Sequence, residues 1–209
     1  MAEPSSRSVL IQGWIDRLRA GDESARAELL QCACDRLTDL TRRMLRRYER
    51  IKRWEQTDDV VQNVAMRLNR TLASVTPEST RDFLRLAALN IRRELLDLAK
   101  HYYGPQGLGT LYRSTPDGES AVGRTGAPDE PADPTRDAER LETWAEFHRQ
   151  VDALPDEQRE VFDLIWYQGL SRAEAAELLG ISERTLMRRW QAARLAIFDA
   201  MDGELPRFD

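Results

Sequence analysis

The side chains with the most specific chemistry in this sequence lie near its C-terminus, in the stretch "ISERTLMRRWQAARLAIF" from Ile181 to Phe198. On a helix, Arg184, Arg188 and Gln191 fall on one face. Apolar residues fall on another face, at i, i+4, i+7 and i+11: Leu186, Trp190, Ala193 and Ile197. An arginine can donate two hydrogen bonds to O6 and N7 of guanine, and a glutamine suits adenine. The pattern predicts a helix that reads base edges in the major groove of DNA.

The residues before this helix predict a second helix and a tight turn. Ser171 followed by Glu174 forms a capping box, which starts a helix. Gly180 stands where the chain must turn, at an expected positive φ, and Ser182 can cap the next helix. The alternative is a helical hairpin whose arginines are only a solvated face. The cap, the turn glycine and the basic outward face together favour a DNA-binding helix-turn-helix.

Two further stretches place polar side chains beside apolar stripes. In "WEQTDDVVQNVAMRL", a polar face is formed by Asp58, Asp59, Gln62 and Asn63. Taken alone, this acidic amphipathic helix is typical of a solvated surface. In "DFLRLAALNIRRELLDLAKHYYG", the side chains of Asn90, Arg93 and Lys100 are predicted to project beside a stripe of apolar residues.

The elements that carry these residues are predicted to be helices almost throughout, so the fold class is all-α. Apolar residues recur at helical spacing, and no stretch alternates as a strand would. Between residues 104 and 137 the sequence is rich in Gly, Pro, Ser, Thr and acidic residues, which predicts a flexible linker. We therefore expect a helical domain over residues 8–103, the acidic linker over 104–137, and a smaller helical domain over 138–202.

Composition excludes several classes of protein. The 209 residues are 41% hydrophobic and 32% charged, and no apolar run is long enough to cross a bilayer. Cys32 and Cys34 point to different faces of a helix, and His101 and His148 are distant in sequence, so neither a disulfide nor a metal site is expected. The sequence lacks an export signal, a nucleophile–base pair and a phosphate-binding glycine loop. We expect a cytoplasmic, non-enzymatic protein without a cofactor.

The order of these parts resembles the extracytoplasmic-function (ECF) group of sigma factors, the two-domain sigma-70-type subunits of bacterial RNA polymerase. "TDDVVQNVAMRL" is similar to the family's region 2.2, and "DFLRLAALNIRRELLDLAKHY" to regions 2.3 and 2.4. "LPDEQREVFDLIWYQGLSRAEAAELLGISERTLMRRWQAARLAIF" is similar to region 4. The segment "IRRELLDLAKHYYGP" is most similar to planctomycete-type members of the family. The resemblance implies a region 2 helical bundle and a region 4 helix-turn-helix.

The resemblance also implies roles for residues of the first domain. The face with Asp58, Asp59, Gln62 and Asn63 would dock on the β′ clamp helices of core RNA polymerase. The promoter −10 element would be opened by the loop residues Thr76, Ser79 and Thr80 with Asn90, while Arg92, Arg93 and Lys100 neutralise phosphate. Two residues depart from the family pattern: Asn63 replaces the usual Glu, and Phe83 stands where many members have Trp.

For the second domain, the resemblance implies recognition of the promoter −35 element and contact with the β flap. The residues implied are Ser182, Arg184, Thr185, Arg188, Arg189, Gln191 and Arg194, with Arg189 and Arg194 nearer the DNA backbone. An anti-sigma factor is the family's commonest restraint. Phosphorylation of Thr57 is a second hypothesis, and the basic run from Arg42 to Arg53 has no assignment.

The net charge of −5 is compatible with DNA binding because the charge is unevenly distributed. The predicted reading helix is basic, while the linker and the helix after it are acidic. We therefore expect weak binding to free DNA, and useful binding only when polymerase adds avidity. Two alternatives remain: a dimeric, stand-alone helix-turn-helix regulator, which leaves "TDDVVQN" without a purpose, and a sigma mimic that binds an anti-sigma factor, which lacks the usual receiver domain.

Overall fold

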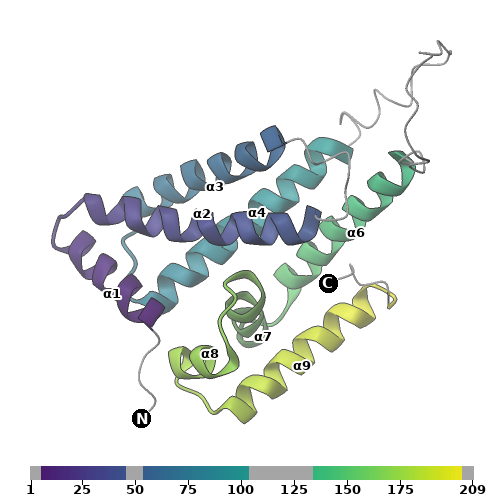
Figure 1. Cartoon of the computed structure of the whole chain (residues 1–209). Coiled ribbons are helices and arrows are strands. Elements are labelled where there is room, and N and C mark those ends of the chain that lie inside the picture. The colour runs from purple at the N-terminus through teal and green to yellow at the C-terminus, as the bar shows by residue number, and fades with distance from the viewer. Residues whose placement is uncertain (1–5, 46–53, 104–133, 204–209) are drawn as a thin grey trace, which may run out of the picture.

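The computed structural model describes residues 6–45, 54–103 and 134–203, and these residues form an all-α structure without a strand (Figure 1). The N-terminal helices are α1 (Ser6–Arg19), α2 (Ser24–Leu45), α3 (Trp54–Ser74) and α4 (Thr80–Tyr103). The C-terminal elements are α6 (Pro134–Ala153), α7 (Asp156–Phe162), the π-helix η1 (Asp163–Tyr167), α8 (Arg172–Leu179) and α9 (Glu183–Ala200). The predicted fold class is confirmed.

The N-terminal helices form because each one carries an apolar stripe at helical spacing. Ile11, Ile15 and Leu18 of α1 are buried against α2 and α4. Between α1 and α2 the chain reverses at Gly21, whose φ of 91° is a conformation that glycine adopts without strain. The carboxylate of Asp22 then accepts a hydrogen bond of 3.0 Å from the backbone N–H of Ser24, which caps the start of α2.

Helices α3 and α4 pack against each other and carry the predicted stripes. Val64 and Leu68 of α3 and Phe83 and Ile91 of α4 are fully buried. Phe83 stands where many members of the resembling family have Trp. Because Phe83 lies in this core, that difference affects the packing of the core in the described arrangement. None of the described helices has the length and apolar character needed to cross a membrane.

The C-terminal half begins earlier than the sequence predicted. Helix α6 starts at Pro134, whereas the predicted boundary of the second domain is residue 138. Proline suits the first turn of a helix, where its fixed φ is favourable and its missing N–H has no partner to lose. Of the predicted linker, residues 104–137, the part from 104 to 133 lies outside the described residues, and residues 134–137 belong to α6. Cys32 and Cys34 are free thiols.

The two halves share their apolar cores. One cluster joins residues of α2, α3 and α4 to residues of α6, α7, η1 and α9, and it includes Leu37, Val64 and Ile91 together with Phe147 and Phe162. Helix α6 runs along α4, and α8 lies near α1 at the other end of the molecule (Figure 1). The predicted division therefore separates two groups of helices that pack on each other in this arrangement.

Candidate nucleic-acid interface

The helix-turn-helix of α8 and α9 has the local geometry that the sequence predicts. The hydroxyl of Ser171 accepts a hydrogen bond from the N–H of Glu174 at 3.3 Å, and the Glu174 carboxylate accepts one from the N–H of Ser171 at 2.8 Å. Gly180 ends α8 with φ 64° and ψ 31°, a left-handed conformation. Its N–H bonds to Glu177 O at 3.0 Å. The capping box and the turn glycine are therefore both confirmed.

Helix α9 presents a basic face to solvent. Its start is capped by Ser182, whose hydroxyl accepts a hydrogen bond of 3.1 Å from the N–H of Thr185. The exposed side chains of the predicted reading face are Arg184, Arg188, Gln191 and Arg194. The buried face packs against α7, where the ring of Trp190 stacks on Phe162 at 5.1 Å. The α9 face can therefore enter a major groove without a change within the helix-turn-helix.

Arg189 lies apart from this face. Its guanidinium forms an ion pair of 2.7 Å with Glu157 of α7, and the Arg189 side chain is only 21% exposed. The hydroxyl of Thr185 also has a local partner, because it lies 2.9 Å from the hydroxyl of Ser182. Arg189 thus links α9 to α7, whereas the contact of Thr185 lies within the first turn of α9.

The predicted polymerase-binding face lies on α3. Gln62 and Asn63 are exposed. The amide of Asn63 bonds to the carboxyl of Glu94 in α4, whose pKa is raised by burial and lowered by Asn63 and by the charge of Arg67, with a net rise. An amide at position 63 thus avoids a second carboxyl beside Glu94. The side chains of Thr57, Asp58, Asp59 and Lys100, and those of the basic run from Arg42 to Arg53, lie outside the described side chains.

The predicted −10 residues in and beside the loop between α3 and α4 differ in their surroundings. Some are exposed, and others form hydrogen bonds that stabilise the start of α4. Thr76 is exposed. Ser79 caps α4, because its hydroxyl accepts from the N–H of Asp82 at 3.2 Å. Thr80 is 4% exposed, and its N–H and hydroxyl donate to the side-chain oxygen of Gln12 at 3.0 and 3.2 Å. Thr80 therefore links α4 to α1 and is buried in this arrangement, and its role at the −10 element stays a prediction.

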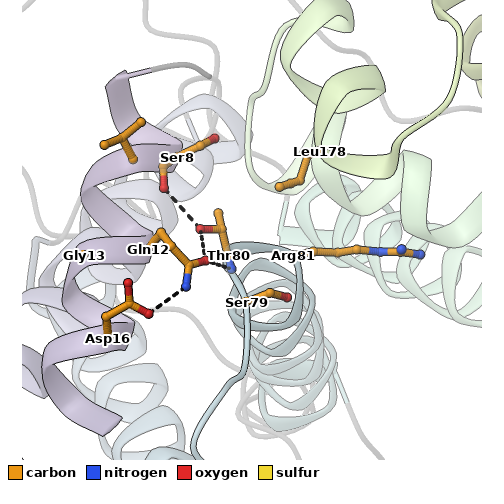
Figure 2. Close-up of a pocket in the computed structure, with 9 residues that line it drawn as sticks. Ser8, Gln12, Gly13, Asp16, Ser79, Thr80, Arg81 and Leu178 are labelled. Carbon is orange, nitrogen blue, oxygen red and sulfur yellow. Dashed lines mark hydrogen bonds between the residues drawn. The ribbon is translucent and has the colours of Figure 1, made fainter. Parts of the chain in front are cut away.

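An open pocket of about 670 Å³ adjoins this loop (Figure 2). One side of the pocket is formed by α1 residues, namely Ser8, Gln12 and Asp16. Next to them, the pocket is lined by Ser79 and Thr80, where the loop meets the start of α4. Leu178 of α8 reaches toward it from the opposite side (Figure 2). The helix-turn-helix therefore supplies part of the wall of a pocket beside the predicted −10 loop.

Two predicted −10 residues of α4, Asn90 and Arg92, are buried in this arrangement, and their role at the −10 element stays a prediction. Asn90 is 3% exposed, and its amide donates a hydrogen bond of 2.8 Å to Leu86 O within the helix. Arg92 is 2% exposed, and its guanidinium donates to the carboxylate of Asp163 in η1 at 2.5 Å. Arg93, the next residue, is exposed. The role of Arg92 was implied by the family resemblance, which does not show that the C-terminal half covers this residue.

The surroundings of Arg92 are electrostatically unusual. Burial is the largest single effect on the pKa of Arg92 and lowers it, but the charges of Asp163, Tyr167 and Asp152 and the hydrogen bond to Asp163 together outweigh burial, so the net change is a rise. Burial raises the pKa of Asp163 to about 6 against the opposing attraction of Arg92. Burial lowers the pKa of His148 to about 3, so this imidazole is neutral, and its Nδ1 lies 2.6 Å from the hydroxyl of Tyr167.

Sequence reasoning did not single out the residues that join the two halves. Arg36 of α2 donates hydrogen bonds to the carbonyl oxygens of Tyr167 at 2.5 Å and Trp166 at 2.8 Å. Arg7 of α1 donates to the carbonyl of Gln168 at 3.1 Å. These carbonyls lie in and just after the π-helix, and no pattern in the sequence predicts a π-helix at that position.

Comparison with known proteins yields one family. The family model described as "ECF sigma factor" matches residues 9–203 of this chain. A comparison with curated proteins finds none that matches. The matched range begins in α1 and ends after α9, so it includes the α3 face, the α3–α4 loop and the helix-turn-helix.

Proposed function

Because the chain belongs to the ECF sigma factor family, we propose that it binds core RNA polymerase in the cytoplasm, selects promoters through both halves of the molecule, and performs no catalysis itself. The observation that carries this proposal is the family match over nearly the whole chain, together with a capped helix-turn-helix whose basic face is exposed. The finer similarity to planctomycete-type members stays a prediction.

The α9 face is proposed to read the −35 element. Arg184, Arg188 and Gln191 can contact base edges, and Arg194 can contact the backbone. This face supports the proposal because its side chains are exposed and its position is fixed by packing of the buried face against α7. The neighbouring surface of the C-terminal half is proposed to dock on the β flap.

The α3 face is proposed to dock on the β′ clamp helices, and the loop before α4 to open the −10 element. Support for docking comes from the exposed Gln62 and Asn63, which belong to the same predicted polar face as Asp58 and Asp59. Support for −10 contact comes from the exposed Thr76 and Arg93 and from the open pocket beside the loop. Acidic residues on the clamp-binding face would fix register and speed encounter with basic partners.

The test is transcription with purified core RNA polymerase on a library of genomic fragments. The wild-type protein is expected to give discrete new start sites. The Asp58→Arg/Asp59→Arg double variant should lose polymerase binding, whereas Arg184→Ala/Arg188→Ala should keep polymerase binding and lose start-site selection. Arg19→Ala removes an exposed arginine at the end of α1 and serves as the matched control. A dimer that shifts a palindromic site without polymerase would instead identify a stand-alone regulator.

A further inference from the structure

The N-terminal helices hold the π-helix through a set of buried polar contacts. Arg92 bonds to the Asp163 side chain, Arg36 bonds to two η1 carbonyl oxygens, and Arg7 bonds to the carbonyl just after η1. Gln168 completes the set, since its amide donates a hydrogen bond of 3.1 Å to Leu84 O of α4. We call these contacts the clasp. Arg92 also bonds to the carboxylate of Asp152 in α6 at 3.1 Å. The bonded partners of Arg92 and Arg36 are at least 60 residues away in sequence, so the clasp depends on tertiary structure alone.

The clasp is a built interface with matched partners. Arg36, Arg92, Asp163 and Gln168 are each less than 10% exposed. A buried charge without a partner is costly, so each guanidinium must find its acceptors when the two halves come together. The fit is also close at Gly169, where an added Cβ would lie 2.7 Å from the Arg36 Cζ. The contact therefore specifies one arrangement of the halves.

This arrangement covers the surface to which the proposed function assigns promoter opening. The guanidinium of Arg92, to which the family resemblance assigns a DNA phosphate, is bound here by the carboxylates of Asp163 and, at 3.1 Å, Asp152. At the start of α4, both carboxylate oxygens of Glu160 bind Arg81, at 2.6 and 2.8 Å. Leu178 of α8 stands over the pocket beside the α3–α4 loop (Figure 2). The basic face of α9 stays exposed in the same arrangement.

We propose that this arrangement is a self-blocked state, in which Asp163 stands in for a DNA phosphate on Arg92 and the C-terminal half covers the −10 surface until the clasp opens. The proposal rests on the proposed sigma function. It assigns to the clasp a regulatory role in addition to a structural one: DNA recognition by α9 and promoter opening by α4 cannot occur together in the clasped molecule.

The chemistry of the clasp makes opening reversible. A buried ion pair contributes little net stability, because the hydration lost by both groups offsets their attraction. Separation returns Arg92 and Asp163 to water, and a phosphate group can then accept two hydrogen bonds from Arg92 in place of the carboxylates of Asp163 and Asp152. The binding of each half to its own site on polymerase would supply the free energy that separates the shared apolar core.

A cleavable cross-link tests the proposal directly in the full chain. Cysteines replace the ion pair Arg81 and Glu160, in a background in which Cys32 and Cys34 are serine. A bis-maleimide with an internal disulfide then locks the halves together. The control carries the same reagent on Arg17→Cys/Asp22→Cys, an exposed ion pair of 2.7 Å that lies wholly in the N-terminal half.

Two readouts separate this proposal from the proposed function. The first is transcript yield with core polymerase, and the second is affinity of the protein alone for a fluorescent single-stranded oligonucleotide. Locking is expected to reduce both by at least about fivefold, the lower end of typical coupling between two states. Cleavage of the reagent by a thiol should restore both values, and the control cross-link should change neither.

A charge reversal provides the opposite perturbation. Asp163→Arg places a like charge beside Arg92, so it should open the clasp, lengthen a spin-label distance between Met66→Cys and Leu195→Cys, and raise oligonucleotide affinity. Both label positions are exposed, at 44% and 60%. Equal transcription by locked and cleaved protein would overturn the proposal. Absence of transcripts from every form, with oligonucleotide affinity still controlled by the lock, would instead refute the sigma function and leave the blocking clasp standing.

Discussion

Substitution of Gly169 by alanine gives a sharp test of the packing around Arg36. Gly169 and Gly180 have nearly the same backbone conformation, with φ of 67° and 64°. Their surroundings differ. A Cβ on Gly180 would meet nothing within 4 Å, whereas a Cβ on Gly169 would lie 2.7 Å from Arg36 Cζ. The pair therefore separates backbone strain from steric contact.

The expected cost of each substitution follows from these surroundings. A residue with a Cβ in the left-handed region costs about 1–2 kcal/mol, and this term applies to both positions. At Gly169 the Arg36 guanidinium must also move, although it is 7% exposed and bonded to the carbonyls of Trp166 and Tyr167. A hydrogen bond to a charged group contributes about 1.5–3 kcal/mol. We therefore expect Gly169→Ala to lower the free energy of unfolding by about 3–5 kcal/mol, and Gly180→Ala by about 1–2 kcal/mol.

The assay is equilibrium urea unfolding followed by tryptophan fluorescence, because Trp166 and Trp190 are half-buried in the shared core. A double-mutant cycle with Arg36→Ala adds the decisive comparison. In that background the steric partner is gone, so the cost of Gly169→Ala should fall to that of Gly180→Ala. Equal losses of unfolding free energy for the two glycine substitutions in the wild-type background would refute the reasoning. They would mean that the Arg36 side chain moves away from the added Cβ without loss of stability.

Three further predictions concern charge. Arg188→Ala should weaken −35 DNA binding by the polymerase complex by about 1–3 kcal/mol, whereas Arg189→Ala should change it less because Arg189 pairs with Glu157; competition binding with promoter fragments measures both. Asn63→Glu should raise the pKa of Glu94 further and destabilise the protein at neutral pH, as carboxyl titration by NMR and urea unfolding would detect. The pKa of Asp163 is raised from 3.8 to about 6, so its contribution to stability is full below the lower value and is lost as pH rises to the upper one. The free energy of unfolding of the wild type minus that of Asp163→Asn should therefore fall as pH rises between these two pKa values. A difference that does not change with pH would contradict the raised pKa of Asp163.

Much of the local structure could be predicted because its causes lie within a few residues of one another. The capping box of Ser171 and Glu174 and the left-handed Gly180 depend on neighbours no more than four positions away. The apolar stripes of α3 and α4 have the same local origin, since helical spacing fixes which side chains share a face. These signals predict the all-α fold and the exposed basic face of α9.

The environment of the predicted −10 residues was decided by tertiary structure. Arg92 looks like a surface residue in sequence, yet it is buried against Asp163 by the packing of the second half of the chain. Thr80 looks like a loop residue, yet Gln12 of α1 holds it. Helical periodicity reports which residues share a face and carries no information about which distant element covers that face. The sequence by itself therefore determined the helices and their chemistry, and only the packing of the two halves decided which of those side chains reach solvent.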